Sequence, residues 1–159
     1  MKPASINEIK KELKYRSQDQ LIEFCLSMAR FKLESKELLT YLLFESDNET
    51  AYINGVKGLI TEQFEDINAS NYYFIKKSAR KILRQTKRFI RYSKKKETEA
   101  ELLLHFNSEL LRIKPSIKRN KVLTNMYNKQ MEMASKAIDK LHDDLKYDLN
   151  ILLSELPRF

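Results

Sequence analysis

The chain has 159 residues and a mass of 18.9 kDa, and its 30 Lys and Arg against 22 Asp and Glu give a formal net charge of +8. It contains only 2 Gly and 1 Cys. So few glycines exclude turn-rich β-sandwiches and barrels, and also the glycine loops of Rossmann and P-loop nucleotide sites. Hydrophobic residues make up 42% of the chain, which is enough to fill a core.

The cysteine count and the absence of long apolar segments suggest in which cellular compartment the protein resides. One cysteine cannot form an internal disulfide, and the first residues become charged at once, without a signal-peptide core. No stretch approaches the ~20 apolar residues of a membrane span. We therefore expect one soluble, cytoplasmic, all-α domain over residues 1–159.

Three short helices are predicted in the first third of the chain. Ser5 and Ser17 each begin a capping box, completed by Glu8 and Gln20 three residues later. The second helix is expected to run to about Phe31. A third helix is expected from Ser35 to about Phe44. The residues expected to face the core are Ile6, Ile9, Leu13, Leu21, Phe24, Cys25, Met28, Phe31, Leu38, Leu39, Leu42 and Leu43.

A fourth helix is predicted after the polar connection 46–48, with an apolar stripe from Tyr52 to Ile67. Both glycines, Gly55 and Gly58, lie inside it, and each costs about 1 kcal/mol relative to Ala. We expect a neighbouring helix to cross closely there. A hinge or a point of ligand approach is the alternative.

Three longer helices are predicted in the remainder of the chain, over about 72–95, 97–113 and 116–156. The last has no Gly or Pro after Pro115, so we expect one helix, with a break near 120–128 as the alternative. Short loops favour antiparallel neighbours, hence six or seven helices stacked as helical hairpins. A bundle and a short α-α superhelix both fit. The apolar stripe of the last helix could also form a homodimer seam.

The positive charge is confined to one segment. Residues 68–96 hold 11 basic residues and no acid, whereas residues 1–67 have a net charge of −3 and residues 97–159 a net charge of zero. At 100° per residue, apolar residues gather on one side of the predicted helix and basic residues on the other. The candidate binding residues on that basic side are Lys77, Arg80, Lys81, Arg84, Lys87, Arg88, Arg91 and Lys95.

Several partners fit such a helix face. It could bind nucleic-acid phosphates, lie on an anionic membrane, or dock an acidic protein partner. It could also face an acidic segment of its own chain, 139–148. A solvated helix face is the plainer interpretation, although such a face normally intersperses Glu to relieve repulsion. The flanking aromatic residues, which could stack on bases or fill the core, are Tyr72, Tyr73, Phe74 and Tyr92.

Residues capable of chemistry are few. Glu101, His105 and Glu109 share a helix face that we expect to be solvated, and His142 follows Asp139 by three residues. A metal site at either histidine would lack ligands, and Cys25 is expected to be a buried structural residue. We therefore predict no catalytic residue, metal or cofactor.

The sequence favours a non-catalytic interaction or scaffold module that binds a protein partner or acidic surface. The alternative is a nucleic-acid-binding protein that uses the basic helix 72–96, although no helix-turn-helix, homeodomain or RNA-recognition signature accompanies it. A third interpretation is a helical metal or catalytic protein that uses His105 or His142.

Overall fold

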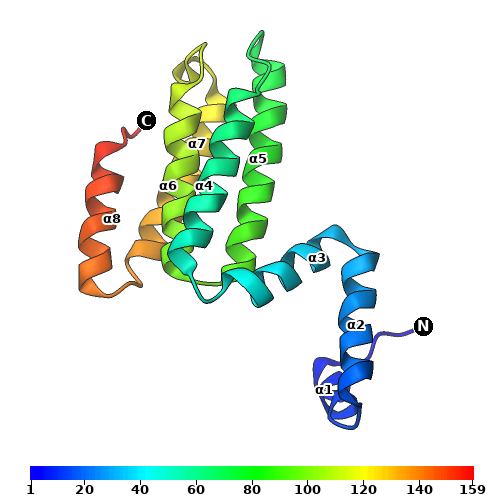
Figure 1. The fold of residues 1–159 in the computed structure, drawn as a ribbon. Helices are drawn as coiled ribbons and strands as arrows, with labels where there is room; N and C mark the ends of the chain where they lie inside the picture. Colours follow the sequence, from blue (N-terminus) through cyan, green and yellow to red (C-terminus); the bar gives the residue numbers. More distant parts are fainter. The chain divides into compact units, whose positions relative to one another are not determined.

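The computed structural model describes residues 1–159 and contains helices but no β-strand (Figure 1). The prediction of an all-α fold is confirmed, but the count of six or seven helices is too low, because eight α-helices form. The chain divides into two compact units, Met1–Phe44 (unit 1) and Glu45–Phe159 (unit 2). One domain over residues 1–159 stays a prediction. None of the helices has the length and apolar character that crossing a membrane requires.

Unit 1 contains α1 (Ile6–Leu13), α2 (Gln18–Phe31) and α3 (Leu33–Thr40), and a π-helical turn, Tyr41–Glu45, follows α3. Both predicted capping boxes form. In the first, the backbone N–H of Glu8 donates to Ser5 Oγ at 3.3 Å and that of Ser5 donates to Glu8 Oε2 at 2.7 Å. The third helix begins two residues before the predicted cap, Ser35.

The core predicted for the first three helices does not form within unit 1. None of α1, α2 and α3 contains a buried residue, and Cys25 is exposed rather than buried. The physical reason is a lack of neighbouring helices, because within unit 1 only the pair α2 and α3 makes extensive contacts. Helical spacing of apolar residues shows which face of a helix is apolar, but it does not show whether another element covers that face.

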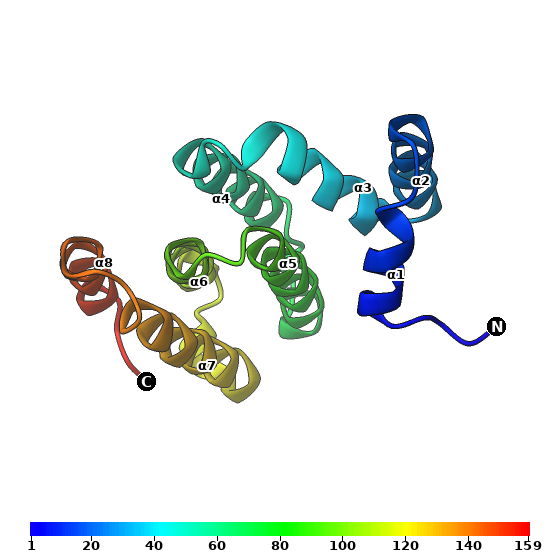
Figure 2. The same ribbon diagram turned by 90° about the horizontal axis from the view of Figure 1, so that it is seen from below.

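Unit 2 contains α4 (Glu49–Glu65), α5 (Tyr72–Ser93), α6 (Lys96–Arg112), α7 (Lys121–Ile138) and α8 (Asp143–Glu155). A 3₁₀ turn, Ile117–Arg119, precedes α7. The central helix is α6, which contacts the other four (Figure 2). It buries residues on most of its circumference, as a helix surrounded by neighbours must. Its buried apolar residues are Ala100, Leu102, Leu103, Leu104, Phe106 and Leu110.

The single helix predicted over 116–156 is wrong. Asn120 begins α7 as its N-cap and accepts a hydrogen bond from the backbone N–H of Leu123, so this region starts a helix rather than interrupting one. The chain then leaves the helix after Ile138. It re-enters at Asp143, where His142 has extended backbone and Asp143 and Asp144 suit the positive end of the α8 dipole.

The close helix crossing predicted at the two glycines is also wrong. Gly55 and Gly58 lie in α4, and a Cβ added to either would meet nothing within 4 Å. Both glycines are exposed. No packing contact therefore accounts for them.

Candidate functional site

The basic helix of the sequence is α5, and local interactions fix its orientation. At its start, Asn71 Oδ1 accepts hydrogen bonds from the backbone N–H groups of Tyr73 and Phe74, at 2.9 and 3.2 Å. Its apolar side packs on α4 and α6. The buried residues on that side include Ile75, Ala79, Ile82 and Thr86. The opposite side of α5 is left at the surface.

Five of the eight predicted binding residues are exposed and make no side-chain ion pair or hydrogen bond: Lys77, Arg80, Lys81, Arg84 and Arg91. A helix rises 1.5 Å per residue, so Lys77 and Arg91 lie about 21 Å apart along the axis. Basic residues recur every three or four positions between them, about one turn apart. The charge of each of these side chains therefore faces solvent instead of a carboxylate.

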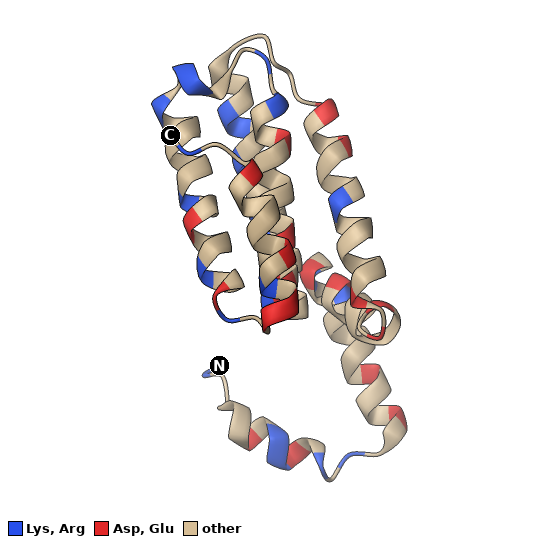
Figure 3. Cartoon of the chain, turned by 90° about the vertical axis from the view of Figure 1, so that its left-hand side faces the viewer, with Lys and Arg blue, Asp and Glu red and all other residues tan.

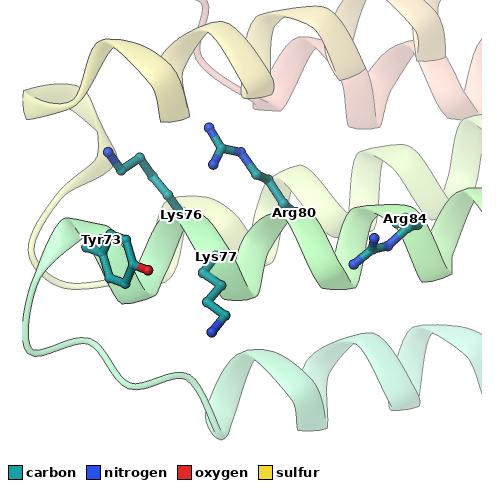
Figure 4. Close-up of a pocket in the computed structure, with 5 residues that line it drawn as sticks. All are labelled: Tyr73, Lys76, Lys77, Arg80 and Arg84. Atoms are coloured by element: carbon teal, nitrogen blue, oxygen red, sulfur yellow. The ribbon is translucent and has the colours of Figure 1, made fainter.

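A groove of about 610 Å³ runs along the N-terminal half of this surface. It is lined by Tyr73, Lys76, Lys77, Arg80 and Arg84. Figure 4 shows Lys76 and Arg80 pointing to one side of α5 and Lys77 to the other, with Tyr73 near the helix start. The groove has no acidic lining residue and one exposed aromatic ring, so its chemistry suits an anion that also carries a flat group.

A second groove of about 510 Å³ adjoins the first and shares Arg80 and Arg84 with it. Its other lining residues are Leu83, Lys87, Ile90, Arg91, Glu99, Leu103 and Met133. Lys87 Nζ lies 3.6 Å from Met133 Sδ on α7. Burial, reinforced by the nearby charge of Lys129, lowers the pKa of Lys87. This groove combines a basic rim with apolar side chains.

We define the basic face as Lys76, Lys77, Arg80, Arg84, Lys87 and Arg91, the basic residues among those that line the two grooves. Lys76 was not among the predicted residues, although the helical wheel places it next to Arg80. Lys129 was missed too, because it comes from α7 and only tertiary packing brings it near Lys87.

Three of the predicted residues lie outside the basic face. Lys81 lines a separate pocket with Asp66, which follows α4. Arg88 is half-buried, and its guanidinium lies 5.9 Å from the Phe89 ring centroid. Lys95 follows α5, and its Nζ lies 2.9 Å from Glu49 Oε2. It is therefore occupied by an ion pair.

The acidic segment of the chain does not cover the basic face. In unit 2, α8 packs on α6 and α7, and α6 lies between it and α5 (Figure 2). Seen from the α8 side, the molecule carries both basic and acidic residues (Figure 3). Of the partners considered from the sequence, the acidic segment 139–148 of the same chain is thus contradicted.

His105 does not lie on a solvated face as predicted, but is half-buried against α4. Its Nε2 lies 3.1 Å from the carbonyl oxygen of Lys57 and 2.9 Å from Thr61 Oγ1. A contact with a carbonyl requires a proton on Nε2, so this nitrogen donates and cannot act as a base toward Thr61. The Thr61 hydroxyl in turn donates to Glu109 Oε1 at 3.3 Å. The cluster links α4 to α6.

The pKa of His105 lies below its usual value because burial disfavours the charged ring, although the nearby Glu109 carboxylate opposes this shift. Glu109 also pairs with Arg112 at 2.9 Å, and Lys57 pairs with Glu101 at 2.5 Å. The carboxylates beside His105 are thus engaged by cations. His142 is exposed at the start of α8. No group of three or more His, Cys, Asp or Glu residues is placed to hold a metal ion.

Comparisons of the chain with protein-family models, with curated proteins and with solved structures find no match.

Proposed function

We propose that the protein is a non-catalytic binding module that holds the phosphates of a nucleic acid on the basic face of α5. The observation that carries this proposal is a row of exposed cations without carboxylate partners. Unpaired cations repel each other at a cost of a few tenths of a kcal/mol per i,i+4 pair, and a bound polyanion relieves that cost. Each neutralised phosphate also releases counterions, which is the main source of affinity for nucleic acids.

The regular spacing of the cations favours a polymer of phosphates over a single small anion. Basic side chains follow one another along about 21 Å of helix, so several phosphates can be neutralised at once. Tyr73, with 65% of its surface exposed, lies in the same groove as four cations. An exposed ring at this position can stack on an unpaired base, which favours a single strand over a duplex.

The test is fluorescence anisotropy with labelled single-stranded DNA and RNA and with a duplex of the same length, at low salt. We expect the wild-type chain to bind the single strands. The variant Arg80→Glu/Arg84→Glu/Arg91→Glu should lose at least about 100-fold in affinity, because three phosphate contacts become repulsive. Its far-UV circular dichroism should match the wild type, since all three positions are exposed.

The matched control is Lys2→Glu/Lys140→Glu/Arg158→Glu. These three residues are also exposed and none belongs to α5, so the variant undergoes the same change in net charge and leaves the basic face intact. It should retain most of the affinity. Equal losses in both variants would show that net charge alone attracts the nucleic acid. No binding by the wild type at low salt, or binding to anionic vesicles only, would contradict the proposal.

An acidic protein segment is the second candidate ligand, and the second groove favours it. Leu83, Ile90 and Met133 add apolar surface beside Arg84 and Arg91. Apolar contacts of this kind, and Met above all, are common where a protein partner docks. The change Leu83→Ser separates the two ligands: it should leave nucleic-acid affinity within about twofold, whereas a protein partner would lose a buried contact.

A cytoplasmic location is proposed together with this function. Cys25 is a free and exposed thiol. Such a thiol persists most readily in a reducing compartment.

A further inference from the structure

The exposed apolar residues of the molecule are concentrated in unit 1. Of 24 large apolar residues that the structure exposes, 15 lie within the first 44 positions. Phe31 of α2 is 90% exposed and Met28 is 58% exposed. Scattered exposed apolar residues are ordinary, but a concentration of this kind marks a surface that another chain covers.

The helix α2 is apolar around more than half of its circumference. At 100° per residue, the positions from Leu21 to Phe31 that carry apolar side chains span roughly 220°. A helix with one neighbour needs only about 100°. Since α3 is the helix that packs extensively on α2, much of this apolar surface stays exposed, including Phe24, Met28 and Phe31.

A unit of 44 residues is too small to be stable through its own hydrophobic core. Domains near ~40 residues usually depend on a disulfide, a metal or association with another chain. The only cysteine is Cys25, and no group of three or more potential metal ligands exists in the chain. Of these three sources of stability, only association with another chain is open to unit 1.

We propose that unit 1 is a self-association module, in which α2 and α3 of two copies pack together as a four-helix interface. The exposed apolar area of these two helices approaches what a stable dimer needs. Phe31, Leu33 and Met28 are 90%, 62% and 58% exposed, which amounts to about 400 Å² for side chains of ~200 Å² each. The other exposed large apolar residues of α2 and α3 bring the total to about 700 Å², close to the ~800 Å² per partner of a standard interface.

The charge balance of unit 1 allows a second copy as the occupant. Unit 1 carries 8 basic and 6 acidic residues, interspersed along its helices, so each copy has a net charge of only +2 and the repulsion between two copies is small. A two-fold interface uses the same patch on both chains, which a single exposed helical hairpin provides. The proposed dimer surface contains none of the residues of the basic face, so dimerisation and nucleic-acid binding can fail independently.

The test is light scattering coupled to gel filtration of the full chain, from about 1 to 100 μM. The wild type should show twice the mass of 18.9 kDa at the upper end. The variant Met28→Glu/Phe31→Glu should raise the dimer dissociation constant by at least about 100-fold, because each copy loses two apolar contacts. Both positions are exposed, so unit 2 should keep its helical circular dichroism, whereas unit 1 should lose helicity on dissociation because it is too small to be stable alone.

The matched control is Tyr147→Glu/Ile151→Glu on α8, which also replaces two exposed apolar side chains by Glu. It should remain dimeric. A nitroxide attached to the single exposed cysteine, Cys25, gives a second readout: double electron–electron resonance should show an intermolecular distance that vanishes on dilution with unlabelled chain. A wild type that is monomeric at 100 μM overturns the proposal, and so does a dimer that only the α8 variant disrupts.

Discussion

Lys95 Nζ lies 2.9 Å from Glu49 Oε2, so the last of the predicted binding residues ties the start of α4 to the turn between α5 and α6. The other oxygen of Glu49 accepts hydrogen bonds from the hydroxyls of Ser93 and Thr98. Arg84, by contrast, has no such partner and lines both grooves. Two basic residues eleven positions apart therefore have different roles.

This difference predicts opposite results for two conservative changes. Lys95→Gln should leave nucleic-acid affinity within about twofold and lower the free energy of unfolding by about 1 kcal/mol, because Glu49 loses a cation. Arg84→Gln should weaken nucleic-acid binding several-fold with little change in stability. Anisotropy titrations and urea denaturation of both variants measure the two quantities. A larger loss of affinity in Lys95→Gln would contradict the assignment.

The open surroundings of the two glycines of α4 predict a gain in stability. Gly55→Ala and Gly58→Ala should each raise the free energy of unfolding by about 1 kcal/mol, since Ala favours the helix and no neighbour obstructs its Cβ. Urea denaturation of each variant measures this gain. If an alanine instead destabilises the chain, the result would favour the alternative interpretation of the glycines as a hinge or a point of ligand approach.

His105 predicts a loss of stability in acid. Its pKa is lowered in the folded chain, so the unfolded chain binds the proton more readily, and stability falls as the pH drops below about 6.5. His105→Gln keeps a side-chain donor for the Lys57 carbonyl but removes the titration. Urea denaturation at pH 7.5 and pH 5.0 should show a smaller acid loss in the variant. Equal losses in both proteins would contradict this role.

We expect the charge of Lys87 to lower the stability of the fold and to strengthen nucleic-acid binding. Burial and the charge of Lys129 lower its pKa, so its charged form opposes folding at neutral pH, and the penalty fades as the pH rises through that lowered pKa. Lys87→Met should raise the urea midpoint at pH 7, because an apolar side chain suits the neighbourhood of Met133. The same variant should bind nucleic acid more weakly. A lower midpoint would show that the ammonium stabilises the fold.

The amino-acid pattern predicted the all-helical fold and the basic side of α5 because both depend on positions within one helix. Ser5 and Ser17 cap as expected, since capping is decided by residues three positions apart. The ion pair of Lys95 with Glu49 and the approach of Lys129 to Lys87 could not be predicted, because the residues of each pair are distant in sequence. The exposure of Phe31 was missed for the same reason, since periodicity does not reveal whether a neighbour exists.

The salt dependence of nucleic-acid binding measures how many phosphates the basic face of α5 neutralises. For a single strand, the logarithm of the association constant should fall linearly with the logarithm of the salt concentration, with a slope of about −0.7 per phosphate neutralised. Five or so contacts along α5 predict a slope of about −3.5 for the wild type, and Arg80→Glu/Arg84→Glu/Arg91→Glu should reduce its magnitude by about 2. A wild-type slope near zero, or a slope unchanged in that variant, would contradict the assignment of α5 as the binding face.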